Sequence, residues 1–271
     1  MRTTVITIAS GRHEHLARQL RALARTDGHV VVAMGRGERP RCRSVCGARS
    51  DVLVVPAAGG LPLAAARNAG AARALHGGAE LLVFLDVDCI PGDTLTARYR
   101  AAAHAEPGAL LCGPVGHLPP PPRDGYPATG LAATARVVGA RPVPSPDELR
   151  TGGDHALFWT LSFAITAATW ARVGGFDEAY VGYGGEDTDF GQRARQAGVD
   201  LCWVGGAWAF HQHHPTQTPP VQHLDDILRN AAVFRKRWGW WPMQGWLDAF
   251  ADRGLAHHDI DADRWLAGTP S

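Results

Sequence analysis

Short apolar, β-branched runs alternate with alanine- and leucine-rich stretches through the first third of the chain. The apolar runs lie at 3–9, 29–34, 51–55 and 80–85. Their almost continuous hydrophobicity is typical of parallel strands buried on both faces. The intervening stretches include three leucines on one helical face near residue 20 and an alanine-rich segment at 63–75. This βαβαβ pattern predicts a right-handed, doubly wound sheet.

The pattern changes after a predicted helix at 93–105 and a short strand at 109–112. Residues 116–150 contain the sequences PPPPRDGYP and RPVPSP, a proline density that favours extended, solvated backbone. A strand predicted at 158–165 rejoins the same sheet. We therefore interpret the proline-rich segment as a loop that serves as a lid or an acceptor wall, and not as a domain boundary.

The remainder of the chain predicts a helix at 186–197, strands at 199–204 and 207–210, and amphipathic helices at 224–238 and 242–250. A chain of 271 residues with 45% hydrophobic content can bury roughly three quarters of the surface that it exposes when unfolded. One domain over residues 1–271 is the resulting expectation.

Composition excludes several classes of partner. Lys and Arg number 27 and Asp and Glu 26, so no global field attracts the protein to nucleic acid. Five cysteines without paired spacing favour a reducing, cytoplasmic setting. The first residues lack the pattern of a signal peptide, and no apolar run has membrane-spanning length. Any contact with a membrane is expected to be peripheral.

Two aspartates follow the predicted strand at 80–85. Asp86 and Asp88 come directly after the sequence LLVFL and precede a proline and a glycine that end the strand. Ligands bind at the carboxyl ends of parallel strands, and paired carboxylates there suit Mg²⁺ or Mn²⁺ bound to a diphosphate. The alternative is a solvated turn, because a lone pair of aspartates is a weak motif.

A second acidic cluster follows a glycine-rich turn. Glu186, Asp187 and Asp189 begin a predicted helix behind the sequence GYGG. Acids in the first turn of a helix complement its dipole, which would account for one of them. The glycines also allow a bulky ligand to approach the backbone, and a carboxylate there can accept a proton from an attacking hydroxyl.

Histidines and arginines complete the set of candidates. His211 and His213 end a predicted strand and project to the same side, so one of them is a candidate metal ligand; the alternatives are a surface histidine run, including His214, or a structural zinc site. Arg12, after the first strand, and Arg67, in a crossover helix, can reach a nucleotide diphosphate, for which arginine offers a fixed fork of donors.

Taken together, these residues resemble the family-2 glycosyltransferases and, more closely, the β-1,4-galactosyltransferases with their galactosyltransferase-type C-terminal domain. The resemblance rests on SGR at 10–12, ARNAG at 66–70, FLDVDCIP at 84–91, GGFD at 174–177, GYGGEDTDF at 182–190 and RNAAVF at 229–234. It covers most of the chain, and the GYGGEDTDF stretch is highly specific.

The resemblance implies an α/β fold of the nucleotide-diphospho-sugar transferase (GT-A) type, with a Rossmann-like, mainly parallel mixed sheet flanked by helices. Residues 1–115 would bind the nucleotide sugar, 116–150 would form the proline-rich loop, and 151–271 would carry the acceptor and catalytic part. The implied activity is metal-dependent transfer of a sugar, from a UDP-hexose in particular, to a hydroxyl of a glycan, lipid-carrier or small-molecule acceptor. Mn²⁺ is expected in preference to Mg²⁺.

Residue roles follow from the same resemblance. Asp187 would be the catalytic base, and Glu186 would bind sugar or acceptor hydroxyls. The implied acceptor-binding residues are Tyr183, Gly184, Gly185 and Glu186. The implied metal ligands are Asp86, Asp88, His211 and His213. The implied donor-binding residues are Ser10, Arg12, Asp51, Arg67, Asn68, Asp86, Val87 and Asp88. Asp51 enters as a base-recognition candidate because the stretch after the second strand, MGRGE, departs from the family pattern.

The mechanism implied is a direct displacement with inversion at the anomeric carbon. A retaining glycosyltransferase is the nearest alternative, because a similar acidic motif occurs in polypeptide N-acetylgalactosaminyltransferases. A nucleotidyltransferase that acts on sugar phosphates is a second alternative, although Ser10-Gly11-Arg12 is a poor phosphate-binding loop. A silent sugar-binding module is a third, and the two intact acidic pairs argue against it.

Overall fold

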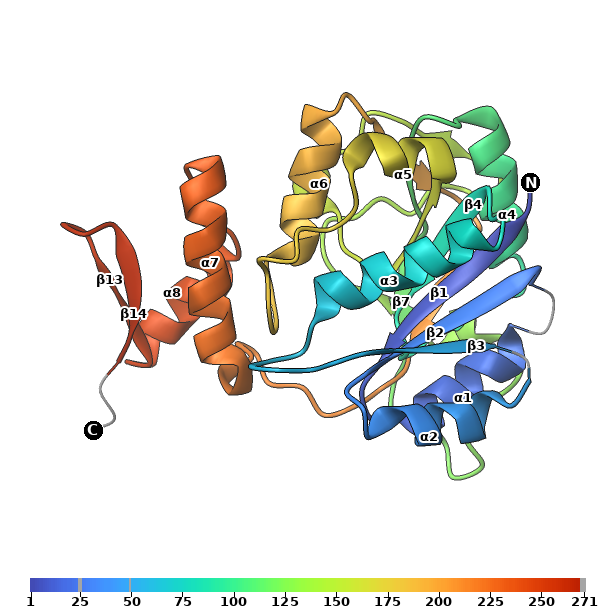
Figure 1. The fold of residues 1–271 in the computed structure, drawn as a ribbon, viewed down its shortest axis with the longest axis horizontal. Coiled ribbons are helices and arrows are strands. Elements are labelled where there is room, and N and C mark those ends of the chain that lie inside the picture. The colour runs from blue at the N-terminus through green and yellow to red at the C-terminus, as the bar shows by residue number, and fades with distance from the viewer. Residues whose placement is uncertain (24–25, 49, 269–271) are drawn as a thin grey trace.

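An eight-stranded mixed sheet forms the centre of the computed structural model, which describes residues 1–23, 26–48 and 50–268 (Figure 1). The strand order is β3 (Asp51–Val55), β2 (Gly28–Met34), β1 (Thr3–Ala9), β4 (Leu81–Leu85), β10 (Ser162–Thr166), β6 (Leu110–Cys112), β11 (Leu201–Val204) and β9 (Leu149–Arg150). The first four strands are mutually parallel, whereas β10 is antiparallel to both of its neighbours. The expectation of a mainly parallel mixed α/β sheet of the GT-A type is confirmed.

Helices cover both faces of this sheet. The α-helices are α1 (His13–Ala22), α2 (Glu38–Cys46), α3 (Leu63–His76), α4 (Leu95–Ala105), α5 (Ala167–Val173), α6 (Glu186–Gln196), α7 (Leu224–Trp238) and α8 (Gln244–Asp252). One face packs against α3, α5 and α6, while the other packs against α4 and, further along, α1 and α2. Gly70 is required where α3 crosses the sheet, since a Cβ there would lie 2.5 Å from Ile6 Cγ2.

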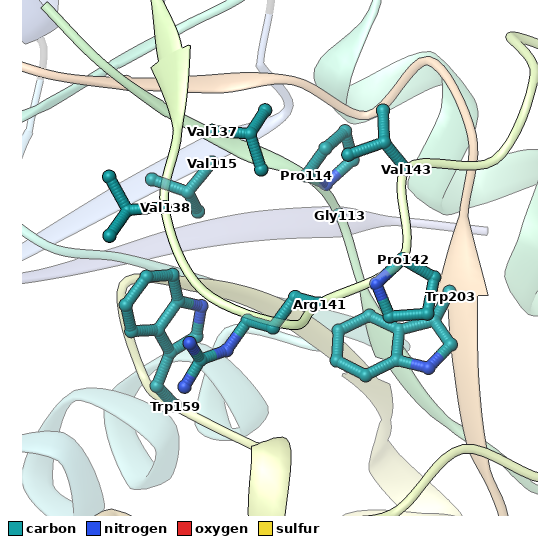
Figure 2. A pocket seen from close by; sticks show the side chains of 10 residues that line it. All are labelled: Gly113, Pro114, Val115, Val137, Val138, Arg141, Pro142, Val143, Trp159 and Trp203. Atoms are coloured by element: carbon teal, nitrogen blue, oxygen red, sulfur yellow. The ribbon is translucent and has the colours of Figure 1, made fainter.

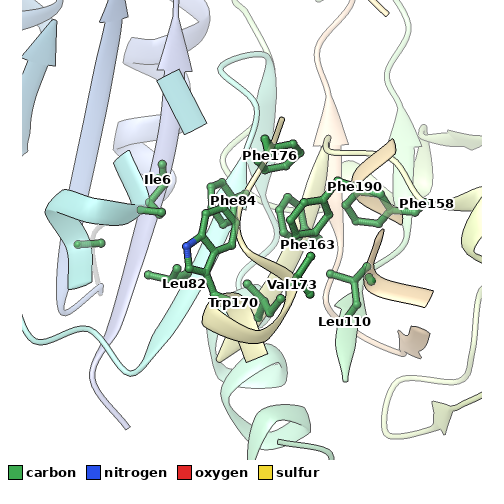
Figure 3. Packing of buried hydrophobic residues seen from close by; sticks show 14 of the residues in the cluster. Ile6, Leu82, Phe84, Leu110, Phe158, Phe163, Trp170, Val173, Phe176 and Phe190 are labelled. Atoms are coloured by element: carbon green, nitrogen blue, oxygen red, sulfur yellow. The ribbon is translucent and has the colours of Figure 1, made fainter. Parts of the chain in front are cut away.

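An aromatic cluster fixes the helix that carries the second acidic motif. Phe190 of α6 stacks on Phe176 with ring centroids 4.3 Å apart, and Phe163 of β10 stacks on Phe84 of β4 at 4.5 Å. Trp170 of α5 joins the same cluster (Figure 3). Aromatic burial of this kind supplies a large apolar area with defined ring geometry. The end of β4 and the start of α6 therefore share one rigid base.

A second sheet is formed largely by strands that directly follow those of the first along the chain. Its order is β5 (Cys89–Pro91), β12 (Ala209–His211), β7 (Val115–His117) and β8 (Arg136–Val137). The strand that we expected at 207–210 belongs to this sheet, and the segment 116–150 supplies β8 and β9 instead of being a loop throughout. Both added strands are only two residues long and lie at positions without proline, which is why the proline-rich composition concealed them.

Other elements also escaped the sequence pattern, among them α2, α5 and the terminal hairpin. The helix α2 has a mostly polar sequence and is held by the burial of Cys42 and Cys46, so it lacks the apolar periodicity of a typical amphipathic helix. Both α5 and the terminal hairpin of β13 (Ala256–Asp259) and β14 (Arg264–Ala267) are short. Among the described residues, no helix combines the length and apolar character needed to cross a membrane.

Candidate active site

The first acidic pair lies where β4 ends, as the sequence predicted. Asp86 leaves the ladder and its carbonyl accepts the N–H of Cys89 at 2.9 Å, which makes a tight turn before β5. The buried Gln19 side chain of α1 donates to the carbonyls of Asp86 and Cys89 at 2.7 and 3.0 Å. The turn is thus held from a neighbouring helix, and both carboxylates project from a fixed backbone.

Arg67 joins the two acidic clusters. Its guanidinium, almost completely buried on α3, donates to Glu186 Oε1 at 3.0 Å, to Asp86 Oδ1 at 3.2 Å and to Thr160 Oγ1 at 2.7 Å. Burial alone would lower the pKa of Arg67, but the carboxylates of Asp86 and Glu186 outweigh it and raise that pKa. The Arg67 guanidinium therefore connects the aspartate pair with the acidic residues at the start of α6, although the two clusters lie about a hundred residues apart in the sequence.

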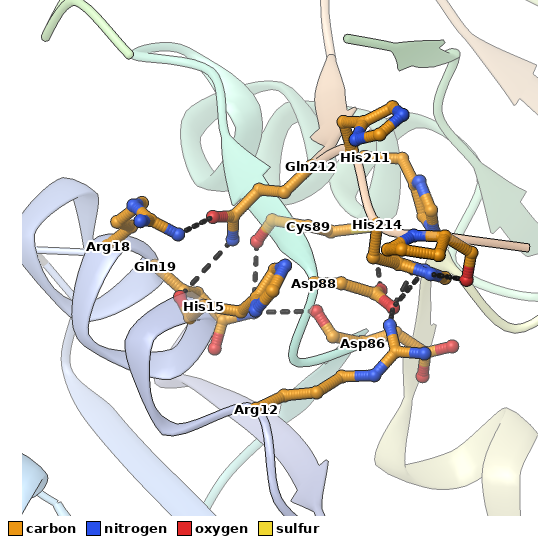
Figure 4. A network of polar contacts seen from close by, with 12 residues as sticks. Arg12, His15, Arg18, Gln19, Asp86, Asp88, Cys89, His211, Gln212 and His214 are labelled. Carbon is orange, nitrogen blue, oxygen red and sulfur yellow. Dashed lines mark hydrogen bonds and ion pairs between the residues drawn. The ribbon is translucent and has the colours of Figure 1, made fainter. Parts of the chain in front are cut away.

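Asp88 lies among nitrogen-bearing side chains. The ring nitrogens Nε2 of His211 and His214 lie 3.5 and 3.4 Å from Asp88 Oδ2, and the Arg12 guanidinium contacts the same oxygen (Figure 4). Burial acts to raise the pKa of Asp88, but hydrogen bonds to the two histidines and the nearby Arg12 bring it well below its usual value. The ligand atoms of Asp88, His211 and His214 all lie within 4.8 Å of one another.

This group differs from the predicted ligand set at two positions, Asp86 and His213. Asp86 lies outside the group, and its Oδ1 accepts from Arg67 instead. The strand β12 ends at His211, so the two-residue alternation that would have placed His213 beside it stops there. The His213 side chain is exposed, and its backbone N–H donates to the Tyr126 hydroxyl at 2.9 Å. After this bend His214 returns toward Asp88 instead. The structure therefore brings in His214 and leaves His213 outside the group.

The second acidic pair begins α6. Burial, together with the neighbouring Asp187, raises the pKa of Glu186 to about 7. Burial also raises the pKa of Asp187, opposed by the Thr188 N–H that donates to its Oδ1 at 2.7 Å. A carboxylate with a raised pKa at neutral pH is the usual setting of a general base. Asp189, by contrast, is fully buried and accepts from Arg237 and Trp238 at 2.7 and 2.9 Å, which is a structural role.

The glycine turn before α6 is held by α7. Asp226 accepts the Tyr183 N–H at 3.1 Å, and the Asn230 amide donates to the Gly184 carbonyl at 2.8 Å and to that of Val181 at 3.1 Å. At Gly182 the backbone has a positive φ and a Cβ would collide with the Asp226 carboxylate. Glycine is therefore required by the close approach of α7.

Aromatic rings line the outer side of this turn. The exposed Tyr183 ring stacks on His223 at 4.5 Å and on Trp246 of α8 at 5.9 Å. His223 was not a candidate in the sequence, because it comes from a separate C-terminal element. The three rings form an aromatic stack, and the faces of aromatic rings are suited to the apolar faces of sugar rings.

The proline-rich segment packs beside the acidic pair. Arg141 stacks on the Trp159 ring with its guanidinium carbon 3.4 Å from the centroid, and both side chains line a small pocket with Val115 and Trp203 (Figure 2). The charge of Arg141 acts on Asp187 by lowering its pKa. Arg141 was not among the site residues predicted from the sequence, because the composition of a proline-rich loop does not indicate which side chain points inward.

The remaining donor-side candidates lie at different depths. Ser10 and Arg12 follow β1 directly, while the Val87 side chain packs in the core beside α1. The Asn68 amide donates to the Phe176 carbonyl at 2.9 Å and accepts its N–H at 2.8 Å, so it supports the chain leading to the acidic helix. Asp51 is the first residue of β3, at the amino edge, and pairs with Arg73. That placement does not support the predicted role of Asp51 in base recognition.

The mixed, mainly parallel sheet has the GT-A type of fold, and it brings together an aspartate pair at a strand end, an acidic helix start and a shared arginine. The family model for the N-terminal domain of galactosyltransferase matches residues 149–216, the part that contains the acidic helix and the histidines. The chain is also similar to validoxylamine A glucosyltransferase of Streptomyces hygroscopicus subsp. jinggangensis, with 31% identity over a match of 224 residues that covers 73% of this chain and 51% of that protein. The recognition made from the sequence is confirmed.

A second relative and two solved structures agree with this class. The validoxylamine A glucosyltransferase of Streptomyces hygroscopicus subsp. limoneus is 32% identical over 57% of this chain and 37% of its own length. The chain thus spans about half or less of these relatives. GalNAc-T7 with UDP, GalNAc and Mn²⁺ has a TM-score of 0.57 at 15% identity, over 92% of this chain and 56% of that one. The structure of Staphylococcus aureus TarS 1–349 with UDP-GlcNAc has a TM-score of 0.56 at 13% identity. This match covers 93% of this chain and 80% of that one.

Proposed function

We propose that the protein transfers a hexose from a UDP-sugar to a hydroxyl acceptor, with a divalent cation and with inversion at the anomeric carbon. The observation that carries this proposal is the meeting of the two acidic clusters on Arg67, through Asp86 and Glu186. Its donor class is supported by TarS, which was solved with UDP-GlcNAc. We also propose a cytoplasmic setting, supported by five buried free cysteines.

The residues around Asp88 fit a divalent cation. A carboxylate with two imidazoles suits Mn²⁺ better than Mg²⁺, which prefers oxygen ligands alone, and the GalNAc-T7 structure contains Mn²⁺. Such an ion, when bound, neutralises charge on a departing diphosphate. Asp88, His211 and His214 would hold it, and Arg12, which contacts Asp88, would donate to a phosphate oxygen at the same place.

The other residues would bind the acceptor and move its proton. The acceptor ring would lie on Tyr183 and Trp246, with a hydroxyl directed at Asp187. Asp187 would take the hydroxyl proton as the oxygen attacks the anomeric carbon, and Glu186 would orient neighbouring hydroxyls. Arg67 keeps the carboxylates of Glu186 and Asp86 at a fixed separation. The anomeric configuration of the product, read by nuclear magnetic resonance, distinguishes inversion from retention.

Nucleotide-sugar binding should require both the ion and His214. A panel of nucleotide sugars with Mn²⁺ should raise the melting temperature, since a ligand at 100 times its dissociation constant adds about 2.7 kcal/mol. Chelation should abolish the shift and the transfer activity, and added Mn²⁺ should restore both. His214→Ala should weaken Mn²⁺ binding at least about tenfold.

The matched control for that experiment is His213→Ala. This neighbouring histidine lies outside the group around Asp88, so its removal should leave Mn²⁺ affinity unchanged. Equal losses in the two variants would contradict the ligand set read from the geometry. Transfer that is indifferent to chelator would remove the metal from the proposal, and the absence of any shift with nucleotide sugars would remove the donor class.

Transfer should also depend on pH through the acidic pair. The base must be ionised, and burial raises the pKa of Glu186 to about 7 and also raises that of Asp187. We therefore expect kcat/KM to rise with pH through an apparent pKa near 7 that belongs to the pair. Glu186→Gln removes the negative charge beside Asp187 and should move the rise of kcat/KM to lower pH. A flat profile through neutrality would contradict the assignment.

A further inference from the structure

A second group of metal-ligand side chains lies where α1 meets α2, apart from the residues around Asp88. His13 is the first residue of α1, and Glu38 and Cys42 lie one turn apart on α2. The two helices lie side by side (Figure 1). The residue before α1, Arg12, has a left-handed backbone with φ of 53°, which turns the chain so that the His13 side chain faces α2.

The three ligand atoms are close together. The His13 ring nitrogen, a Glu38 carboxylate oxygen and the Cys42 sulfur all lie within 4.8 Å of one another. The Gly11 N–H donates to Glu38 Oε2 at 2.8 Å and so fixes that carboxylate. Ligands of one tetrahedral zinc ion are separated by about 3.5 Å, so small side-chain rotations bring these atoms to binding distance.

One of these groups lacks a satisfactory partner among the described residues, and a second is a fully buried thiol. Nε2 of His13 lies 2.9 Å from Glu38 Oε2 but is buried without a hydrogen bond of acceptable geometry. The Cys42 thiol is completely buried, and burial raises its pKa to about 11. A buried polar group without a partner destabilises the folded state, and one cation would bind the histidine nitrogen and the thiolate together.

We propose that His13, Glu38 and Cys42 form a binding site for a thiophilic divalent cation, specifically Zn²⁺. Imidazole, carboxylate and thiolate are the three types of protein ligand that zinc takes, and a water molecule would complete four-coordination. Binding forms a zinc–sulfur bond and releases the thiol proton to solvent. The Gly11 N–H supplies the outer contact that orients the Glu38 ligand.

Occupancy of this site would act on the neighbouring Arg12. Since His13 directly follows Arg12, a cation that links His13 to α2 fixes the backbone from which the Arg12 guanidinium reaches Asp88. Zinc here would therefore stabilise the junction of α1 and α2 beside the proposed donor site. The site does not depend on the proposed sugar transfer, because none of its three ligands takes part in that reaction.

Cobalt is the probe for this site, because a cobalt–thiolate bond gives a charge-transfer absorption that carboxylates and imidazoles do not. The titration uses the full chain carrying Asp88→Asn and His214→Ala, which removes the other metal group. One equivalent of Co²⁺ should produce the band, and Zn²⁺ should displace it. Cys42→Ser should abolish the band, and His13→Ala should weaken binding at least about tenfold.

The matched control is Cys46→Ser. Cys46 is buried on the same helix, and Ser50 hydrogen-bonds to its thiol, so the band should persist in this variant. Circular dichroism shows whether each variant is folded, and the partly exposed His13 gives a second test if Cys42→Ser is not. No thiolate band in the parent protein, a band that survives Cys42→Ser, or unchanged affinity in folded His13→Ala would each overturn the proposal.

Discussion

Replacing Asp187 with Asn should lower turnover by about 10²–10⁴ while the affinity for the nucleotide sugar is retained. The amide keeps the size and the Thr188 contact of the carboxylate but cannot accept the proton of the acceptor hydroxyl. Because Asp187 is half-buried at the surface of the site, the folded state should tolerate the change. Steady-state transfer rates and calorimetric donor titration measure the two quantities separately.

Asp189→Asn is the informative contrast, since it changes the same residue type two positions along α6. Asp189 accepts from Arg237 and Trp238 in the core, and the loss of its charge should reduce stability before it affects the chemical step. A loss of turnover in Asp189→Asn at full stability, or normal turnover in Asp187→Asn, would contradict the assignment of Asp187 as the base.

Replacing Arg67 with Met should lower the free energy of unfolding by about 3–5 kcal/mol. Methionine has a comparable length and keeps the contact with the Phe176 ring, but it leaves the carboxylates of Asp86 and Glu186 without their shared cation. Removing one partner of a buried charge pair leaves an uncompensated charge in a poorly solvated place. Chemical denaturation of the two proteins measures the difference directly.

The loss should depend on pH in a defined direction. Without Arg67 the pKa values of the two carboxyls rise further above their values in the unfolded chain, so the folded state holds more protons. Stability of the variant should therefore fall as the pH rises above the unfolded value of about 4.3. The deficit should be smallest in mild acid, and a pH-independent deficit would argue against buried charge as its cause.

Arg73→Met provides the control on the same helix. Arg73 pairs with Asp51, and both side chains are more than a third exposed. Exposed pairs contribute about 0–1 kcal/mol because water and salt screen them. A similar loss in the two arginine variants would show that the effect comes from helix α3 generally, and not from the link between the acidic clusters.

The position of Asp86 and Asp88 at the end of a strand was predictable because it depends on local sequence. The run LLVFL gives a buried strand at 81–85, and the aspartates that follow it must lie at the carboxyl edge. The start of α6 at Glu186 was likewise readable from the glycines before it and the acids in its first turn. The match of residues 149–216 to the galactosyltransferase model falls on the part that the motif had already identified.

Positions that depend on tertiary packing were not predictable. His214 replaces His213 because β12 stops at His211, and a strand end cannot be located to one residue from composition. Asp51 has the right residue type but lies at the amino edge of β3, where Arg73 binds it. Arg141 lies in a proline-rich segment without regular periodicity, so the sequence does not indicate which way its side chain points. In each case the deciding contact comes from residues distant in sequence.

The contacts between α7 and the glycine turn affect the order in which parts of the structure can form during synthesis. Asp226 and Asn230 lie more than forty residues after Tyr183 and Gly184, whose backbone they bind. The central strands and the group around Asp88 precede α7 in the sequence, whereas the turn proposed to face the acceptor takes its final shape only after α7 has been synthesised. The proposed acceptor-binding turn therefore forms later during synthesis than the group around Asp88.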